Sequence, residues 1–327
     1  MDKSKVFIIW QAYTAGPEIK GLGPRNVLWY LGFTNGTNTK YSSTMLRFGL
    51  RAHDFGPCEA GPLADRIAAC GVSCVQLALS KAFPGFPALP GRLSPGFAKA
   101  TRDSFTARGI DIAVLGCYIN PVHPDTEVRE TQLRRFEEHL RFARDFGCSL
   151  VGTETGSLNP DCSWHPDTGG KAAFDALCGS VERLVRIAER CGSIVAIEPV
   201  ADQHTVSSIE RTKAVIDRID SPALGIIFDP VNLIPRKGLK ESQADFFERA
   251  FEAFGSRVVA VHLKDFRMAE GEKSEIVAPG SGEFDFTAFF RLLQEKKPGI
   301  EALLENTSPA TAPAALEFVR RTAAEQR

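Results

Sequence analysis

Four ionisable side chains each stand at the end of a short apolar run of the kind that forms a buried strand. They are Glu198, Asp229, His262 and Glu305. Neighbouring members of this set are separated by about one strand–helix unit, so a parallel sheet would bring all four to the same edge. Three carboxylates in a low-dielectric site repel one another, and a divalent cation removes that cost. The donor set favours one Mn²⁺ ion, with Mg²⁺, Co²⁺ or Zn²⁺ as alternatives.

Each of these residues taken alone has a simpler explanation. A carboxylate at a strand end often caps the next helix or forms an ion pair. A single histidine after an apolar strand is more often a hydrogen-bonded core residue. The joint pattern over four successive strands is much harder to obtain by accident, so it favours a metal site formed by all four side chains.

Eight short apolar runs alternate with segments of helical period from residue 45 onward. This alternation is typical of parallel strand–helix–strand units. Eight such units close most naturally into a (β/α)8 TIM barrel, an α/β fold with a single domain. No glycine-rich phosphate loop follows the first run, which argues against an open nucleotide-binding sheet. The runs lie at residues 46–52, 73–79, 111–117, 148–154, 194–198, 224–229, 258–263 and 301–305.

Helix signals between these runs support the same fold. Apolar residues in the segment 174–188 recur at spacings of three and four, which places them on one helix face. Ser94 followed by Pro95 predicts an N-cap with proline at the first helical position. Ser207 with Glu210 predicts a capping box at the start of a later helix.

Residues 1–44 differ from the rest of the chain. They match no helical period and end in a polar, turn-prone tract at residues 34–44. The apolar stretch near Val6 is too short for an export signal. We interpret residues 1–44 as a poorly ordered N-terminal extension and residues 45–327 as the barrel. A chain that starts at Met45 is expected to keep its melting temperature and activity.

The composition narrows the classes of partner. The net charge of −1, from 39 basic and 40 acidic residues, provides no electrostatic footprint for nucleic acid or an anionic membrane. No apolar run approaches the ~20 residues that span a bilayer. The eight cysteines form no C-x-x-C pair and predict reduced thiols of a cytoplasmic protein. We expect a small-molecule ligand, no nucleic acid and no membrane partner, and we leave a homo-oligomer open.

Six short motifs carry a family resemblance from about Phe48 to the C-terminus. They are GLRAHD at 49–54, VGTETG at 151–156, IEP at 197–199, FDPVN at 228–232, VHLKD at 261–265 and LE at 304–305. Together they resemble the xylose isomerase-like barrels of the sugar phosphate isomerase/epimerase group, which includes D-tagatose 3-epimerase.

The resemblance implies roles for particular residues. The four strand-end side chains would bind the metal, and Glu198 and Glu305 would also form the acid/base pair. His204 and Arg267 lie near positions that contact substrate in that group. Asn232 is a further candidate substrate ligand and stands where those epimerases have a histidine, which leaves the metal set intact and argues against a free ketohexose as substrate.

Further candidate substrate ligands follow other strands. Glu154 ends the fourth run and is predicted to point into the pocket. His53 forms either a pocket wall or a local hydrogen bond, and Gln76 either lines the site or belongs to a polar layer inside the barrel. Lys264 would neutralise a phosphate or an enediolate, or else pair with the next residue. The turn at residues 279–282 would cradle phosphate or serve only as a glycine turn.

These groups predict a metal-dependent isomerase or epimerase acting on a sugar or sugar derivative. One glutamate would remove a proton next to a carbonyl to form a metal-stabilised enediolate, and the place of proton return would decide between epimerisation and isomerisation. The alternatives are a lyase or dehydratase acting on a keto-cyclitol or related substrate, an endonuclease IV-type nuclease, and a non-catalytic sugar-binding barrel. The neutral charge and only six histidines count against the nuclease.

Overall fold

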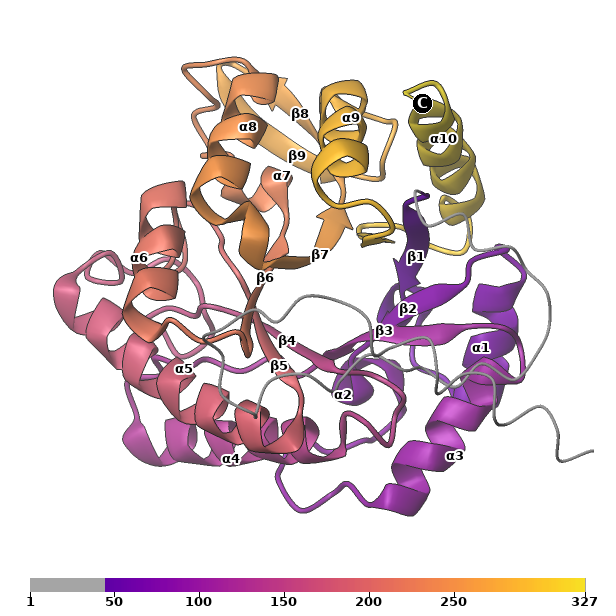
Figure 1. Cartoon of the computed structure of the whole chain (residues 1–327), viewed down its shortest axis with the longest axis vertical. Helices are drawn as coiled ribbons and strands as arrows, with labels where there is room; N and C mark the ends of the chain where they lie inside the picture. The colour runs from indigo at the N-terminus through magenta and orange to yellow at the C-terminus, as the bar shows by residue number, and fades with distance from the viewer. Residues whose placement is uncertain (1–44, 327) are drawn as a thin grey trace, which may run out of the picture. The chain divides into compact units, whose positions relative to one another are not determined.

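The computed structural model describes residues 45–326, and within them eight parallel strands form a closed barrel. Around the barrel the strands follow the order β1, β10, β7, β6, β5, β4, β3, β2. Barrel strands that follow one another in the sequence are therefore neighbours in the sheet, and the first strand pairs with the last. Figure 1 shows the strands in the centre with the helices outside them. The predicted (β/α)8 fold is confirmed. The barrel strands are β1 (Arg47–Arg51), β2 (Cys74–Leu77), β3 (Asp111–Gly116), β4 (Leu150–Glu154), β5 (Ile194–Glu198), β6 (Leu224–Phe228), β7 (Val258–Leu263) and β10 (Glu301–Leu304).

The outer layer consists of helices that follow the barrel strands, and short helical turns shape the loops at the strand ends. The longer helices are α1 (Ala60–Ala68), α3 (Pro95–Thr106), α4 (Thr126–Phe142), α5 (Lys171–Cys191), α6 (Ile209–Ile219), α8 (Gln243–Phe254), α9 (Phe286–Lys296) and α10 (Ala312–Ala324). The short turns are η2 (Ala52–Phe55), α2 (Leu79–Ala82), α7 (Pro230–Leu233) and η3 (Gly255–Arg257).

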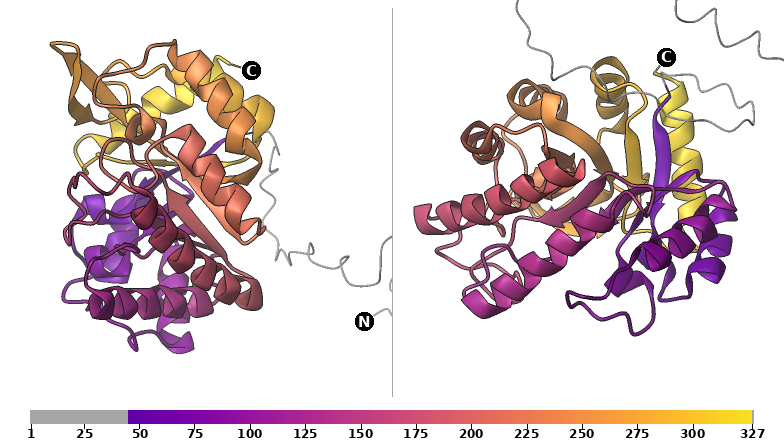
Figure 2. Two further views of the ribbon diagram at one scale, coloured as in Figure 1. Left: turned by 90° about the vertical axis from the view of Figure 1, so that its left-hand side faces the viewer. Right: turned by 60° about the horizontal axis from the view of Figure 1, so that its bottom comes forward.

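The alternating pattern missed one element, an antiparallel hairpin that follows β7 directly. It consists of β8 (Asp265–Ala269) and β9 (Glu272–Val277), and its outer end stands away from the barrel in the left view of Figure 2. Glu270 and Gly271 form its two-residue turn with φ of 54° and 79°. Positive φ at both turn residues matches the twist of the strands that flank them. The helix expected after the seventh strand therefore begins only at Phe286.

The helix-start predictions have mixed outcomes. Ser94 caps α3 by accepting a hydrogen bond from Phe97 N, and Pro95 is the first helical residue, as predicted. The capping box at Ser207 is wrong by one position. Ser208 caps α6 and accepts from Arg211 N, so Glu210 lies in the first turn without the spacing of a capping box.

The core fixes β6 on both of its faces. Inside the barrel, the end of the Ile227 side chain packs against Gly152, where a Cβ would lie 2.8 Å from Ile227 Cδ1. Outside the barrel, Phe228 packs edge-on against Phe254 and Phe289, with ring centroids 5.4 and 5.8 Å apart. Such aromatic pairs contribute about 0.5–1.5 kcal/mol each beyond the area they bury. Asp229, which follows Phe228, is therefore attached to the end of a tightly packed strand.

Two further observations concern the described part of the chain. All eight cysteines lie within it, and none of them is joined in a disulfide. Among residues 45–326, no helix combines the length and apolarity needed to cross a membrane. The predicted N-terminal extension, residues 1–44, lies outside the described residues.

Candidate metal centre

Four neighbouring barrel strands deliver the four predicted ligands. Glu198 is the last residue of β5, Asp229 follows β6 and caps α7, His262 lies near the end of β7, and Glu305 follows β10. The pairing of β10 with β7 continues one residue beyond the end of β10, because Glu305 N donates to Leu263 O at 2.9 Å. All four side chains are buried, with residue exposures of 3% or less. Charged groups are therefore concentrated where water cannot stabilise them.

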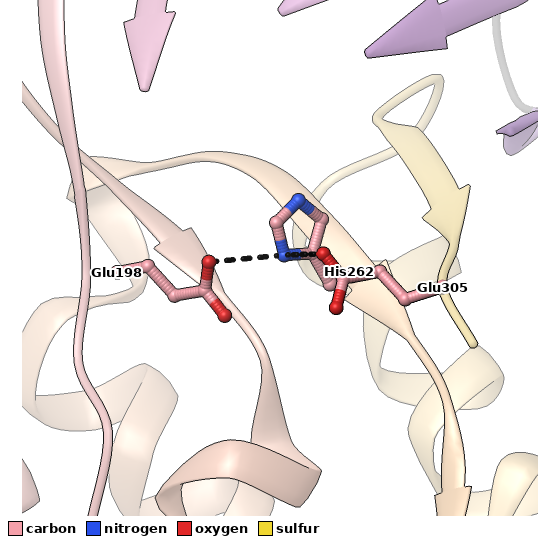
Figure 3. Close-up of side chains that lie close together, drawn as sticks. All are labelled: Glu198, His262 and Glu305. Carbon is pink, nitrogen blue, oxygen red and sulfur yellow. Dashed lines mark ion pairs between the residues drawn. The ribbon is translucent and has the colours of Figure 1, made fainter. Parts of the chain in front are cut away.

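Three of these side chains meet at one point. His262 Nδ1 lies 3.2 Å from Glu198 Oε2 and 3.1 Å from Glu305 Oε1. Figure 3 shows the ring between the two carboxylates, with the same nitrogen facing both. One ligand atom from each residue lies within 4.8 Å of the others. Within residues 45–326 this is the one group of three or more such side chains that could share an ion.

The other ring nitrogen of His262 determines what Nδ1 presents. His262 Nε2 lies 2.6 Å from Gln76 Oε1, and Gln76 Nε2 donates to Tyr118 Oη at 2.7 Å. The amide oxygen of Gln76 can only accept, so Nε2 carries the hydrogen of the neutral ring and Nδ1 carries the lone pair. A second hydrogen bond of this kind typically fixes the tautomer of a metal-binding histidine.

The buried Nδ1 has no hydrogen-bond partner among the described residues, although it faces two carboxylate oxygens. A lone pair opposite two anions is unfavourable unless a proton or a cation lies between them. Two carboxylates and one imidazole are donors that Mn²⁺, Mg²⁺, Co²⁺ and Zn²⁺ accept. The residues therefore fit a divalent metal ion.

Asp229 stands beside this trio rather than within it. Its Oδ1 accepts from Asn232 N at 2.9 Å, which caps α7, and its Oδ2 lies 2.9 Å from Lys264 Nζ. The same ammonium lies 2.8 Å from Glu305 Oε2. Lys264 therefore neutralises two of the predicted ligands at once, and its pairing with Asp265, one of the alternatives, is not what the structure shows.

The charges shift the pKa values of the ligands in opposite directions. Burial opposes the ionisation of Glu305, but His262, Lys264 and Arg51 outweigh it and lower its pKa. Burial likewise disfavours ionised Glu198, and the nearby His262 lowers its pKa overall. Burial disfavours a charged His262, but Glu305 and Glu198 raise its pKa to about 9. Without a metal, the trio holds a proton where a cation would otherwise bind.

Asn232, predicted to contact substrate, forms hydrogen bonds with two members of the charged cluster, Glu198 and Lys264. Its Nδ2 donates to Glu198 Oε1 at 2.7 Å, and its Oδ1 accepts from Lys264 Nζ at 3.0 Å. The amide thus links one glutamate to the ammonium that holds the other. This arrangement leaves the side chain of Asn232 a positioning role between ligands.

Two other predicted substrate ligands lie together beside β4 and β5. His204 Nε2 is 3.7 Å from Glu154 Oε2, and His204 Nδ1 has no hydrogen-bond partner in the described chain. Burial lowers the pKa of His204 to about 4, so the ring is neutral. Burial, Glu198 and Glu305 raise the pKa of Glu154 to about 7. Both can exchange hydrogen bonds with a polar ligand near neutral pH.

The remaining predicted residues differ in position. His53 packs edge-on against the Tyr118 ring, with centroids 6.1 Å apart, and its buried Nδ1 lacks a hydrogen-bond partner within residues 45–326. Arg267 is not brought to the cluster. It lies exposed on β8, where it contacts Ser281 O at 3.0 Å and Glu275 Oε2 at 3.1 Å. The unpredicted hairpin carries this arginine into those surface contacts.

The glycine turn at residues 279–282 has an internal partner. Asp265 Oδ2 accepts from Gly280 N at 3.1 Å and from Gly282 N at 2.8 Å. These amides are therefore already bonded to a carboxylate. The structure favours the glycine-turn interpretation over a phosphate cradle.

Sequence reasoning missed two contributors on the first strands. Arg51 Nη1 lies 3.2 Å from Glu305 Oε2, because barrel closure sets β1 beside β10. Tyr118 follows β3 and receives the hydrogen bond from Gln76. Arg51 lies in the GLRAHD motif, and Tyr118 comes directly after an apolar run. Both could have been found by considering the polar residues at the ends of the first three predicted strands.

Comparison with solved structures identifies the same barrel. A xylose isomerase-like TIM barrel protein from Mycobacterium smegmatis in complex with magnesium has a TM-score of 0.68 at 17% identity, covering 88% of this chain and 100% of that chain. A D-tagatose 3-epimerase-like protein has a TM-score of 0.68 at 17% identity, covering 86% and 98%. The 3-keto-D-glucoside 4-epimerase of E. coli has a TM-score of 0.65 at 17% identity, covering 85% and 100%. At these identities the likeness shows the fold.

Curated relatives match shorter segments. A 3-oxo-isoapionate decarboxylase of Pectobacterium atrosepticum is 32% identical over 101 residues, 29% of this chain and 34% of that protein. A probable endonuclease 4 of Chlorobium phaeovibrioides is 28% identical over 187 residues, 54% of this chain and 63% of that protein. The chain thus matches less than two thirds of the length of either relative.

The family model covers far more of the chain than these segments do. The model described as xylose isomerase-like TIM barrel matches residues 64–322, which include seven of the eight barrel strands and all four predicted ligands. With the closed parallel barrel, this match shows that the chain belongs to the xylose isomerase-like TIM barrel family.

Proposed function

We propose that the protein is a divalent-metal-dependent enzyme that removes a proton next to the carbonyl of a sugar or sugar derivative, and so epimerises or isomerises it. One observation carries this proposal: the carboxylates of Glu198 and Glu305 face the unbonded Nδ1 of His262 from two separate strands. Bases presented from two directions are what inversion of a carbon centre requires.

Glu198, His262 and Glu305 would hold the ion, with Asp229 as the fourth candidate ligand once Lys264 shifts away from it. Mn²⁺ is the proposed ion, with Mg²⁺, Co²⁺ and Zn²⁺ as alternatives. A bound divalent ion would polarise the substrate carbonyl and lower the pKa of the adjacent C–H group.

The protein side chains account for the proton transfers. Glu198 is oriented by Asn232 through Oε1 and Glu305 by Lys264 through Oε2, so each presents its other oxygen to the site. One carboxylate would take the carbon-bound proton, and the other would return a proton to the opposite face. Burial disfavours a charged Lys264, but Asp229, Glu305 and Glu198 raise its pKa, so its ammonium persists beside the developing negative charge.

A second candidate is cleavage of a 3-oxo acid or a related lyase reaction. The observation in its favour is the matched segment of the 3-oxo-isoapionate decarboxylase. Loss of CO₂ next to a carbonyl also leaves an enediolate-type anion, so the same cluster would serve it. A nuclease is less well supported despite the endonuclease 4 relative, because the ligand group among residues 45–326 contains a single histidine.

Glutamine variants of the two bases test the proposal. E198Q and E305Q keep the side-chain size and one ligand oxygen but remove the basic carboxylate. Turnover and substrate deuterium incorporation, followed by NMR with a panel of sugars, 3-keto sugars and 3-oxo acids, are expected to fall by about 10²–10⁴. E252Q, on the exposed face of α8, is the matched control and should keep full activity. Retention of more than about a tenth of turnover by both variants would exclude the two-base mechanism.

A further inference from the structure

Lys81 is an unpaired cation close to the metal centre. It lies on the exposed side of α2, the short helix that follows β2, at the end of the barrel where the ligands lie. Its Nζ stands 3.8 Å from the centroid of the Tyr118 ring. None of the ion pairs and side-chain hydrogen bonds found among residues 45–326 includes Lys81, whereas Lys264 nearby has three oxygen partners.

The ring of Tyr118 lies between the Lys81 ammonium and the predicted metal ligand His262. Tyr118 Oη accepts from Gln76, and Gln76 accepts from His262, so two side chains separate Lys81 from His262 along this chain of contacts. Lys81 therefore does not compensate the ligand charges by direct contact. A cation over an aromatic face is held in position but keeps its N–H groups free to donate elsewhere.

The surroundings of Lys81 provide too little negative charge for it. Although the side chain is exposed in part, desolvation of its ammonium lowers the pKa of Lys81, and Glu154, the strongest of the acidic groups that oppose this, does not restore it. His53, which packs edge-on against Tyr118, contributes a buried Nδ1 without a hydrogen-bond partner in the described chain. The cation and the unbonded ring nitrogen thus belong to two side chains that contact the same aromatic ring.

We propose that Lys81 binds an anionic group of the substrate, a carboxylate or a phosphate, above the Tyr118 ring and away from the reacting carbon. The inference rests on the proposed function, because it names the substrate class of the same site: a sugar acid or a sugar phosphate rather than a neutral sugar. His53 would accept a hydrogen bond from an adjacent hydroxyl group, since burial together with Arg51 and Lys81 lowers its pKa to about 3 and keeps the ring neutral.

Three six-carbon probes without a reactive carbonyl test this assignment by calorimetric titration of the metal-loaded protein. D-sorbitol is neutral, D-gluconate carries a carboxylate, and D-sorbitol 6-phosphate carries a phosphate. The wild-type protein should bind at least one anionic probe about tenfold or more tightly than sorbitol, the size of a charge-assisted hydrogen bond. Whichever anion is preferred identifies the source of the charge.

Variants then locate the preference. K81M should abolish the advantage of the anionic probe, apart from any direct coordination of the ion, and leave the affinity for sorbitol unchanged, whereas K81R should retain more of the advantage than K81M does. K99M is the matched control, because Lys99 is an exposed lysine on α3 that pairs with Asp103. In the wild type, added salt should weaken the anionic probe and leave sorbitol unaffected, a measurement that does not depend on a variant folding.

Several outcomes would overturn the inference: equal affinities for all three probes, no binding of either anion, or an equal loss of all three in K81M. Gluconate can also coordinate the ion, but that contribution is independent of Lys81 and persists in K81M. The proposed function fails separately. If the wild type exchanged no substrate deuterium with any compound yet kept a Lys81-dependent preference for anions, the anion site would stand and the two-base chemistry would not.

Discussion

A metal-binding histidine presents one ring nitrogen to the ion, and a hydrogen bond to the other ring nitrogen fixes its tautomer and orientation. In this protein Gln76, on β2, holds His262 Nε2 from across the barrel at 2.6 Å. Gln76 is in turn oriented by Tyr118, so its amide oxygen cannot turn away without losing a hydrogen bond. Nδ1 therefore faces the two glutamates before any ion arrives.

Replacing Gln76 with leucine should weaken metal binding with little change in the fold. The hydrogen bond that fixes the ring tautomer would be lost, and the loss of such outer partners typically costs about 10–100-fold in metal affinity. Titration of metal-free Q76L with Mn²⁺ measures the change. Q294L is the control, because Gln294 on α9 bonds only Ala323 O among the described residues. An unchanged Mn²⁺ affinity in Q76L would mean that the ring is oriented by packing alone.

At the scale of elements, the hairpin β8–β9 is tied to the site by Asp265. Its carboxylate accepts hydrogen bonds from the backbone amides of Phe266, Gly280, Gly282 and Phe284 at 2.8–3.1 Å. Asp265 directly follows Lys264, so the loop that it organises also holds that ammonium beside the two carboxylates. A Cβ on Gly282 would lie 2.2 Å from Phe266 O, so this close approach requires glycine.

Removal of this carboxylate should destabilise the whole protein. D265A would leave four amides without their acceptor, two of them on the buried residues Phe266 and Phe284, at a cost on the order of 3 kcal/mol in the free energy of unfolding. Urea unfolding followed by circular dichroism measures it. E275A, which removes an exposed carboxylate from the same hairpin, should change stability by less than about 1 kcal/mol. Equal effects of the two substitutions would show that Asp265 does not organise the loop.

For the whole molecule, the buried cluster couples stability to pH and to metal. The pKa of His262 is raised from 6.5 to about 9 in the metal-free fold, because Glu305 and Glu198 outweigh the effect of burial. This protonation stabilises the metal-free protein fully below pH 6.5, and the contribution is lost as the pH rises through about 9. A metal ion displaces the same proton, so its affinity should increase about tenfold per pH unit below that pKa.

The stabilisation that Mn²⁺ provides should therefore increase with pH. Melting temperatures at pH 6.0, 7.25 and 8.5, with and without a fixed Mn²⁺ concentration, measure the increment, because a ligand bound only by the folded state raises the melting temperature according to its affinity. Other titrating groups contribute mainly to both curves and largely cancel in the difference. In H262A the increment should be small and nearly independent of pH. A wild-type increment that decreases with pH would contradict the expected displacement of a proton from His262.

The sequence by itself determined the barrel and the four strand-end residues. Both depend on local order: apolar runs alternate with helical period, and parallel strands end at one edge, so a polar residue after each run must lie there. Glu198, Asp229, His262 and Glu305 could be selected on this ground without any knowledge of contacts. Arg267 was selected by the family resemblance and not by a place at a strand end, and the hairpin that follows β7 carries it on β8.

Only the tertiary structure decided how these groups are paired. Barrel closure sets β1 beside β10 and brings Arg51 to Glu305, and the width of the barrel allows Gln76 to reach His262. Lys264 was expected to neutralise a phosphate or an enediolate, or to pair with Asp265, and in the structure its ion pairs are with Asp229 and Glu305. Such partners are far apart in the chain and depend on strand register and side-chain rotamers, which a pattern of apolar and polar residues does not specify.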